Sequence, residues 1–181
     1  TPPISISLSG LPLGVSAGAN GFWVNDGTGN QILHYPTVDQ LPLKDAVVWK
    51  SGNGKRRLIV FTDPNCGYCK RLERELQQVK DVTVYNFVVA ILGDDSRQKA
   101  EAIWCAKDRT QTWRDWMLNG SVPPAATPKC DAGTLERNTE LGRKHRVQGT
   151  PAAVFEDNTR LPGAVPADQI EKQLVLSARK I

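Results

Sequence analysis

The sequence predicts an α/β protein in which a mixed β-sheet carries helices on both faces and has a helical insert in its middle. Leu58–Phe61 is a continuous apolar run, which is typical of a strand buried on both faces. Apolar residues then recur at intervals of three and four from Cys69 to Val79, which predicts an amphipathic helix. A second β-rich run follows at residues 82–92, so residues 57–92 form a β-α-β unit.

The residues before this unit predict a small β-rich N-terminal segment. Asp26-Gly27 lies between two short apolar runs, a pattern that favours a hairpin turn. The predicted elements are an irregular lead-in at residues 1–20, strands at 21–24 and 31–35, a short connection at 36–45 and a further strand at 46–49. We therefore expect an N-terminal segment over residues 1–45 and a larger domain over residues 46–181.

Helical patterns dominate the middle of the larger domain, and prolines separate them. A strand at residues 152–155 follows, and a helix that begins near Pro166 closes the chain. The helix of the β-α-β unit is expected to begin at Cys66, with Asn65 as its N-cap. The helical stretches at residues 98–107, 112–118 and 132–146 form the predicted insert, over about residues 95–146.

The composition excludes several classes of protein. Of the 181 residues, 40% are hydrophobic and 23% are charged, which is the balance of a globular protein. The longest apolar run, residues 87–92, is far below the roughly 20 residues that a membrane-spanning helix needs. The 23 Lys and Arg exceed the 19 Asp and Glu by only four charges, and Lys55–Arg57 is the only tight basic cluster. We therefore expect neither membrane insertion nor nucleic-acid binding.

Four cysteines, Cys66, Cys69, Cys105 and Cys130, allow three disulfide pairings. Their spacing favours Cys66 with Cys69 and Cys105 with Cys130. A zinc site is the competing interpretation, because a Cys-x-x-Cys pair is half of many such sites. The second half is missing, since Cys105 and Cys130 lie 25 positions apart and the two histidines are far from each other. We predict no metal site.

A Cys-x-x-Cys pair that follows a buried strand and opens a helix has a specific chemical meaning. The first N–H groups of a helix have no intrahelical partner and the helix dipole is positive there, so a thiolate at Cys66 is stabilised. Cys69 lies about one turn deeper, on the face of Leu72 and Leu76, and should be less exposed. These positions predict Cys66 as the nucleophile and Cys69 as the thiol that resolves a mixed disulfide. A static disulfide is the alternative, but so short a loop gains little chain entropy.

The residues around the cysteines bear on the redox balance. Gly67 and Tyr68 are uncharged, whereas Lys70 and Arg71 add positive potential within one turn. Positive potential stabilises the reduced thiolate and makes the disulfide form more oxidising.

Three ordered motifs carry a resemblance to a known family. They are FTDPNCGYCK at residues 61–70, AIWCAKD at residues 102–108 and GTPA at residues 149–152. Over about residues 46–178 the chain resembles the DsbC/DsbG family of periplasmic thiol-disulfide isomerases. The catalytic domain of that family has a thioredoxin fold with a helical insertion, so the resemblance implies a thioredoxin-like fold here.

The resemblance also implies roles for individual residues. In the family the first cysteine attacks substrate disulfides and the second resolves them, which assigns these steps to Cys66 and Cys69. It implies a cis peptide bond at Thr150–Pro151, although from the residues alone Pro151 only starts a strand. The residues expected to line the substrate groove are Thr150, Pro151, Gly67 and Tyr68.

A second, non-catalytic disulfide in the insert is implied by the same resemblance, at Cys105–Cys130. Bridging a loop of this length stabilises a protein by roughly 3 to 3.5 kcal/mol on the chain-entropy model. The alternative is two reduced buried cysteines, which fit only a reducing compartment.

The N-terminal region departs from the family, whose members carry a dimerisation domain and a linker helix. Residues 21–35 resemble the hairpin-like end of that domain, but the preceding helix is missing and residues 36–45 are too short for the linker helix. A homodimer therefore stays an open question. The apolar hairpin residues either pair two chains or pack on the protein's own catalytic domain. These residues are Phe22, Trp23, Ile32, Leu33 and Tyr35.

The leading functional hypothesis is an enzyme that reshuffles wrong disulfides in exported proteins. Its expected partners are misfolded or reduced exported proteins and a membrane thiol reductase of the DsbD type. The alternative is a monomeric thiol oxidase or reductase with a narrow set of clients, such as a secretion or conjugation apparatus. A third hypothesis is a binding module or chaperone whose cysteines are only structural.

The thiols carry the electrons themselves, so we expect neither a metal nor an organic cofactor. His34 and His145 are interpreted as solvated residues. Thr1–Ile4 contains neither a charged n-region nor an apolar segment, so the protein is either cytosolic or has lost a signal peptide. A structural disulfide favours export, and we expect the periplasm.

Overall fold

The computed structural model describes residues 15–18, 21–25, 31–34 and 38–178, with side chains from residue 38 onward. The chain divides into two compact units, Thr1–Leu41 and Pro42–Ile181.

The first unit contains an antiparallel sheet in the order β1-β2-β3. β2 (Gly21–Asn25) pairs with β3 (Gln31–His34), so the predicted hairpin strands are confirmed. β1 (Val15–Gly18) lies within the stretch predicted to be irregular, and that prediction was wrong there. The Gly- and Ser-rich composition of this stretch carries no strand signal, but four of its residues form a strand that pairs with β2. The side chains of Phe22, Trp23, Ile32, Leu33 and Tyr35 lie outside the described part, so their role stays a prediction.

The predicted connection at residues 36–45 contains two short 3-10 helices, η1 (Val38–Gln40) and η2 (Leu43–Asp45). The second of these leads directly into the sheet of the second unit.

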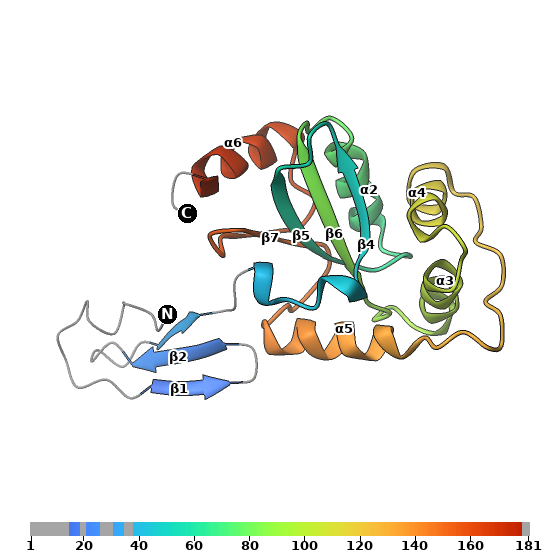
Figure 1. Ribbon diagram of the computed structural model, residues 1–181, viewed down its shortest axis with the longest axis horizontal. Coiled ribbons are helices and arrows are strands. Elements are labelled where there is room, and N and C mark those ends of the chain that lie inside the picture. The colour runs from blue at the N-terminus through green and yellow to red at the C-terminus, as the bar shows by residue number, and fades with distance from the viewer. Residues whose placement is uncertain (1–14, 19–20, 26–30, 35–37, 179–181) are drawn as a thin grey trace. The chain divides into compact units, whose positions relative to one another are not determined.

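A five-stranded mixed sheet forms the centre of the second unit, in the order β4-β6-β5-β7-β8 (Figure 1). β5 and β6 are parallel neighbours, and the other pairs are antiparallel. Leu58 of β5 lies between Val84 of β6 and Phe155 of β7, and its side chain is fully buried. The strands are β4 (Val47–Ser51), β5 (Arg56–Thr62), β6 (Val82–Val88), β7 (Ala152–Phe155) and β8 (Arg160–Pro162).

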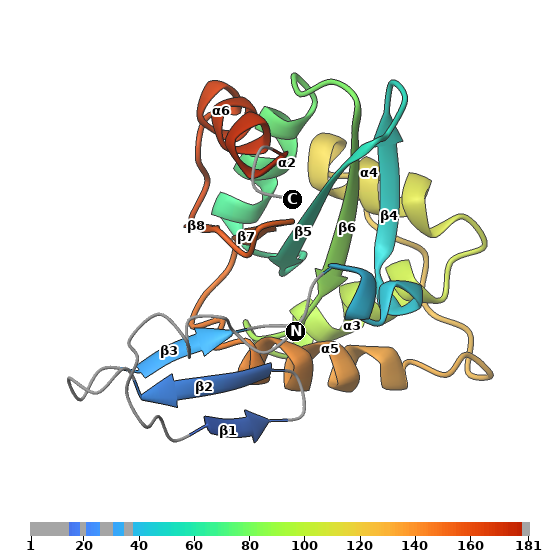
Figure 2. The same cartoon turned by 60° about the vertical axis from the view of Figure 1, so that its left-hand side comes forward.

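Helices cover both faces of this sheet, which confirms the predicted fold class (Figures 1 and 2). One face packs against α2, α4 and α6, and α3 packs against α4. The other face carries α5, where Gly142 lies against the ring of Phe61. The helices are α2 (Gly67–Leu76), α3 (Asp94–Trp104), α4 (Arg109–Asn119), α5 (Gly133–Lys144) and α6 (Ala167–Ala178).

Several element boundaries differ from the sequence prediction. α3 begins four residues earlier than expected, directly after Gly93, whose φ of 109° suits glycine. α4 begins three residues earlier, because the Asp108 side chain accepts a hydrogen bond from the N–H of Gln111 and caps the helix. β8 was not predicted, since its three residues include a proline and carry no strand signal.

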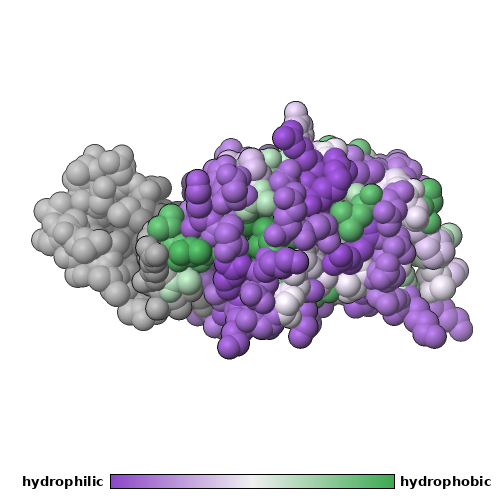
Figure 3. Space-filling view, turned by 90° about the horizontal axis from the view of Figure 1, so that it is seen from above, coloured by the Kyte–Doolittle hydropathy of each residue, from purple (hydrophilic) through white to green (hydrophobic). Residues whose placement is uncertain are grey.

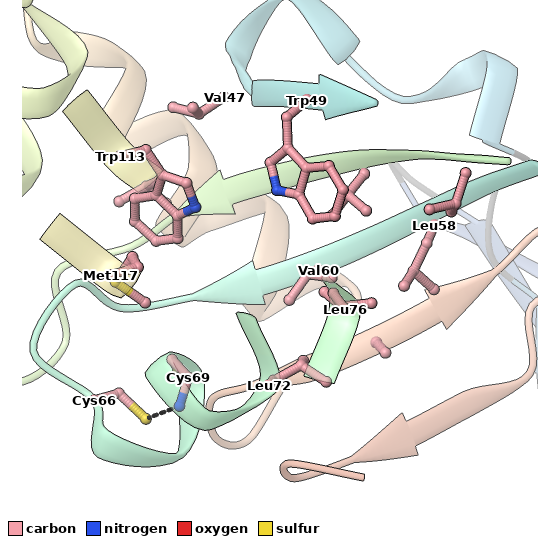
Figure 4. Packing of buried hydrophobic residues seen from close by; sticks show 14 of the residues in the cluster. Val47, Trp49, Leu58, Val60, Cys66, Cys69, Leu72, Leu76, Trp113 and Met117 are labelled. Atoms are coloured by element: carbon pink, nitrogen blue, oxygen red, sulfur yellow. Dashed lines mark hydrogen bonds between the residues drawn. The ribbon is translucent and has the colours of Figure 1, made fainter. Parts of the chain in front are cut away.

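In the core on the α2 face, side chains of β4, β5, β6 and β7 pack together with side chains of the helical insert (Figure 4). The predicted stripe of α2 is confirmed, since Cys69, Leu72 and Leu76 are buried against the sheet. Val79 is also buried, although α2 ends before it. In Figure 4 the side chains of Trp113 and Met117 approach this stripe from α4.

Apolar side chains are only sparsely displayed on the face of the molecule that Figure 3 shows. Hydrophilic residues of the second unit predominate there, and hydrophobic residues form small separate patches. The most exposed large apolar side chains of the described residues are Tyr68, Ile91, Leu92, Val122, Val175 and Leu176.

Candidate active site

The two cysteines of the Cys-x-x-Cys pair lie at the start of α2, immediately after β5 (Figure 4). Cys66 itself is the N-cap of the helix, so the prediction of Asn65 as N-cap was wrong. The backbone N–H of Cys69 donates a hydrogen bond to Cys66 Sγ, over 3.2 Å. Sulfur therefore occupies the place that a Ser or Asp oxygen takes in an ordinary cap.

Cys66 and Cys69 differ in their surroundings, although both are free thiols in the structure. Cys66 is 8% exposed and Cys69 is 2% exposed. Burial raises the pKa of Cys69 to about 12, because the thiolate loses its hydration. The N–H of Asp63, 3.5 Å from Cys69 Sγ, opposes this rise only in part. At neutral pH Cys69 is therefore a protonated thiol.

The loop before β7 meets the cysteines from the other side. The peptide bond Thr150–Pro151 is cis, as the sequence resemblance implied. Cys66 Sγ lies 3.6 Å from the carbonyl oxygen of Thr150 and donates a hydrogen bond to it as a thiol. This approach follows from the sheet, because Phe61 at the end of β5 pairs with Ala152 at the start of β7.

The residues between the cysteines face outward. In the described part of the chain, no atom outside the helix's own backbone and the two neighbouring residues lies within 4 Å of the place that a Cβ on Gly67 would take. Tyr68 is 66% exposed. Ile91 and Leu92, which follow β6, are also about half exposed. Because β5 and β6 are parallel, the loops that follow them lie at the same edge of the sheet. This edge therefore displays apolar side chains on the segments next to the cysteines.

Asp63 is a buried residue of this site that the sequence analysis did not single out. Its carboxylate joins the loop after β5, the loop after β6 and the start of α3. An aspartate directly after a buried strand was the only available signal, and that signal is not specific. The donors to its carboxylate are the N–H groups of Asn65, Ile91 and Leu92 and the hydroxyl of Ser96.

A disulfide joins Cys105 to Cys130, with their Cα atoms 5.8 Å apart. Cys105 is the C-cap of α3, and Cys130 precedes α5, so the bond lies within the helical insert. It closes a segment that contains α4 and the prolines at 123, 124 and 128.

Glu73, a buried carboxyl group, lies in α2 one turn after Cys69. Burial raises the pKa of Glu73 to about 7, and the indole of Trp113, the charge of Arg114 and the indole of Trp49 oppose this rise only in part. Glu73 lies outside the apolar stripe of α2, and it is buried because Trp113 and Arg114 of α4 lie beside it.

His145 is also buried, at 3% exposure, so its interpretation as a solvated residue was wrong. It follows α5, and its ring lies near that of Phe61. Burial lowers the pKa of His145 to about 4, with a smaller contribution from the charge of Arg160.

Among the residues that the structure describes, no three His, Cys, Asp or Glu side chains come together in a way that could hold a metal ion. None of the helices in the described ranges combines the length and the apolar character needed to cross a membrane.

Comparisons with known proteins place the second unit among thioredoxin-like proteins. A model of the thioredoxin-like domain matches residues 43–177. The probable thiol:disulfide interchange protein DsbC of Bordetella parapertussis is 47% identical over 136 residues, which are 75% of this chain and 48% of the relative. The thiol:disulfide interchange protein DsbC of Escherichia coli is 33% identical over 135 residues, which are 72% of this chain and 56% of that protein. The chain thus spans about half the length of these relatives.

A solved structure shows the same fold. The crystal structure of a disulfide interchange protein from Neisseria gonorrhoeae matches with a TM-score of 0.70 and 37% identity. The match covers 76% of this chain and 98% of that one. The expectation of a thioredoxin-like fold is therefore confirmed.

Proposed function

Since this chain belongs to the thioredoxin-like domain family, and within it to the DsbC-like disulfide interchange proteins, we propose that it is a thiol-disulfide oxidoreductase whose redox pair is Cys66 and Cys69. The observation that carries the proposal is the hydrogen bond from the Cys69 N–H to Cys66 Sγ at the N-cap of α2. A sulfur at this position lies at the positive end of the helix dipole, which favours the thiolate.

The different environments of the two cysteines give them different steps in the reaction. The Cys66 thiolate attacks one sulfur of a substrate disulfide, forms a mixed disulfide and releases the other substrate sulfur as a thiolate. Cys69 then loses its proton and attacks Cys66 Sγ. This second step releases the remaining substrate thiolate and leaves a Cys66–Cys69 disulfide, so two electrons pass from the pair to the substrate. The raised pKa of Cys69 supports this order, because it keeps Cys69 protonated until the mixed disulfide has formed.

Reshuffling of non-native disulfides is the activity that we assign to this pair. In that reaction a second thiol of the client attacks the mixed disulfide and regenerates the Cys66 thiolate, with no net transfer of electrons. Thr150, Pro151, Gly67 and Tyr68 form the groove in which the client lies. The 3.6 Å approach of Cys66 Sγ to the Thr150 carbonyl and the exposure of Tyr68 support this assignment.

The partners follow from the same chemistry. The clients are misfolded or reduced exported proteins, and a membrane thiol reductase of the DsbD type returns the pair to its reduced form. The Cys105–Cys130 disulfide is a structural staple of the insert. The presence of both a structural disulfide and two free thiols in one chain supports the periplasm as the compartment.

Refolding of a scrambled, fully oxidised disulfide protein in a glutathione buffer tests this proposal. We expect the wild type to restore native disulfides, Cys66→Ser to restore none, and Cys69→Ser to accumulate mixed disulfides with the client. A fully active Cys66→Ser variant would refute the redox pair. Normal exchange with small disulfides but no refolding would refute the isomerase and favour a thiol oxidase or reductase with few clients.

A further inference from the structure

The helical insert holds each of the three residues that precede Cys66. The loop Asp63–Asn65 connects β5 to α2 and thereby places Cys66. Side chains of α3 and α4 bind it at every position. The Ser96 hydroxyl donates to the Asp63 carboxylate, the Trp116 indole N–H donates to the Pro64 carbonyl over 2.6 Å, and the Asn65 amide donates to the Asp95 carboxylate over 2.7 Å.

Trp116 is the central residue of this attachment. It lies on α4, and its ring also receives the ammonium groups of two lysines from other helices. Lys70 Nζ of α2 lies 4.0 Å from the ring centroid, and Lys99 Nζ of α3 lies 4.9 Å from it. Lys99 also forms an ion pair with Asp95, the residue that binds Asn65. Three helices and the loop before Cys66 therefore meet at one indole.

The indole N–H gives the Pro64 carbonyl a fixed direction. Proline has no backbone N–H of its own, so the carbonyl is the only backbone group with which Pro64 can anchor the loop. The next peptide unit leads directly to Cys66, whose N–H bonds to the carbonyl of Asp63 at 3.1 Å. A rotation of the Pro64 carbonyl would therefore move Cys66 relative to the N–H of Cys69.

We propose that Trp116 is a positioning residue, which holds Cys66 at the N-cap of α2 through the Pro64 carbonyl and so sets the thiol-disulfide equilibrium of the pair. This inference rests on the proposed function of Cys66 and Cys69. The reduced form depends on the placement of Cys66, because the loop and the hydrogen bonds with the Cys69 N–H and the Thr150 carbonyl hold its sulfur without a covalent bond. In the oxidised form the covalent bond to Cys69 holds that sulfur. A loosened loop therefore destabilises the reduced form more than the oxidised form.

The substitution Trp116→Phe isolates this role. Phenylalanine keeps an aromatic face for Lys70 and Lys99 but cannot donate to Pro64. The matched control is Trp104→Phe, because Trp104 lies in the same insert and its ring packs instead against Arg109, 3.7 Å from the ring centroid. The measurement is the equilibrium between the reduced protein with oxidised glutathione and the oxidised protein with two reduced glutathione molecules, read by acid quench, alkylation and mass spectrometry.

We expect Trp116→Phe to shift this equilibrium about threefold to tenfold towards the protein disulfide, which corresponds to the loss of one hydrogen bond. Trp104→Phe should leave it unchanged. Denaturant unfolding of both redox forms separates positioning from general stability. A merely structural role lowers the stability of both forms equally, whereas positioning lowers that of the reduced form more.

A second variant, Asn65→Ala, removes the exposed anchor to Asp95 and should shift the equilibrium in the same direction. An equilibrium unchanged in both Trp116→Phe and Asn65→Ala would overturn the positioning role while leaving the proposed redox pair intact. A wild-type pair that does not exchange with glutathione at all would overturn the proposed function itself.

Discussion

Cys66 Sγ lies 3.6 Å from the carbonyl oxygen of Thr150, so two segments 84 residues apart in the sequence meet at the reactive sulfur. The antiparallel pairing of β5 with β7 brings them together, since one strand ends beside α2 where the other begins after the cis-proline. A substrate sulfur that reaches Cys66 must therefore lie beside this loop.

The Thr150 side chain bears on the second cysteine of the pair. Its hydroxyl is among the groups that favour the Cys69 thiolate and partly offset the effect of burial on the pKa of Cys69. Thr150→Val keeps the shape and removes the hydroxyl. We expect the decay of a Cys66–glutathione mixed disulfide to slow about threefold to tenfold, the size expected for one hydrogen bond. Stopped-flow mixing with mass spectrometry measures this decay, and an unchanged rate would exclude a role for the hydroxyl.

Glu73 should make the protein less stable as the pH rises. Its pKa is about 7 in the folded protein against an ordinary value of 4.5, so between these pH values the unfolded chain releases a proton that the folded chain retains. The contribution of Glu73 to the free energy of unfolding therefore falls over this window, by roughly 3 kcal/mol. Glu73→Gln should remove this fall and be more stable than the wild type at pH 8. Urea unfolding from pH 4 to pH 8 measures it, and parallel curves would contradict the expectation.

His145 should have the opposite effect. Its pKa is about 4 in the folded protein against an ordinary 6.5, so as the pH falls through this window the unfolded chain binds a proton first. Stability is then lost on acidification, by roughly 2 to 3 kcal/mol. His145→Gln should lose less stability between pH 6.5 and pH 4. This pH window overlaps that of Glu73, and the two effects on stability have opposite signs. The free energy of unfolding of the wild type should therefore vary less with pH than that of either variant. Urea unfolding of all three proteins measures this difference.

The Cys105–Cys130 disulfide should contribute stability. Its sequence separation of 25 residues corresponds to roughly 3 to 3.5 kcal/mol on the chain-entropy model. The free energy of unfolding of the double variant Cys105→Ala, Cys130→Ala should be lower by this amount, so the variant should unfold at a lower urea concentration, while Cys66 keeps its reactivity. The same unfolding midpoint in the variant and the wild type would show that the bond does not stabilise the fold.

Periodic patterns in the sequence sufficed for the central sheet and for the helices around it. The run Leu58–Phe61 and the stripe from Cys69 to Leu76 are long and regular, and both have the predicted burial. Short elements without a periodic pattern, such as β1 and β8, were not predicted. The N-cap at Cys66 was not predicted either, because Asn is the better capping residue by type. In the fold, the Asn65 side chain binds Asp95 instead of capping the helix.

The cysteine pair could be found in the sequence, but its supports could not. Asp63 and Trp116 act through contacts such as those with Ser96 and Pro64, which lie 33 and 52 positions away, and Glu73 acts through Trp113 of another helix. No local pattern encodes such contacts. In the sequence, Trp116 in particular cannot be distinguished from the other apolar residues of its helix. Its significance appears only when α4 is placed against the loop before Cys66.

The central claim is that Cys66 is the reactive thiol and Cys69 the protected one. Timed alkylation of the reduced protein at pH 7, followed by peptide mass spectrometry, tests this claim most directly. Cys66 should be modified rapidly, and Cys69, with its raised pKa, should remain unmodified until the protein unfolds. Faster modification of Cys69, or equal inertness of both thiols in the folded protein, would contradict the claim and favour a binding module whose cysteines are only structural.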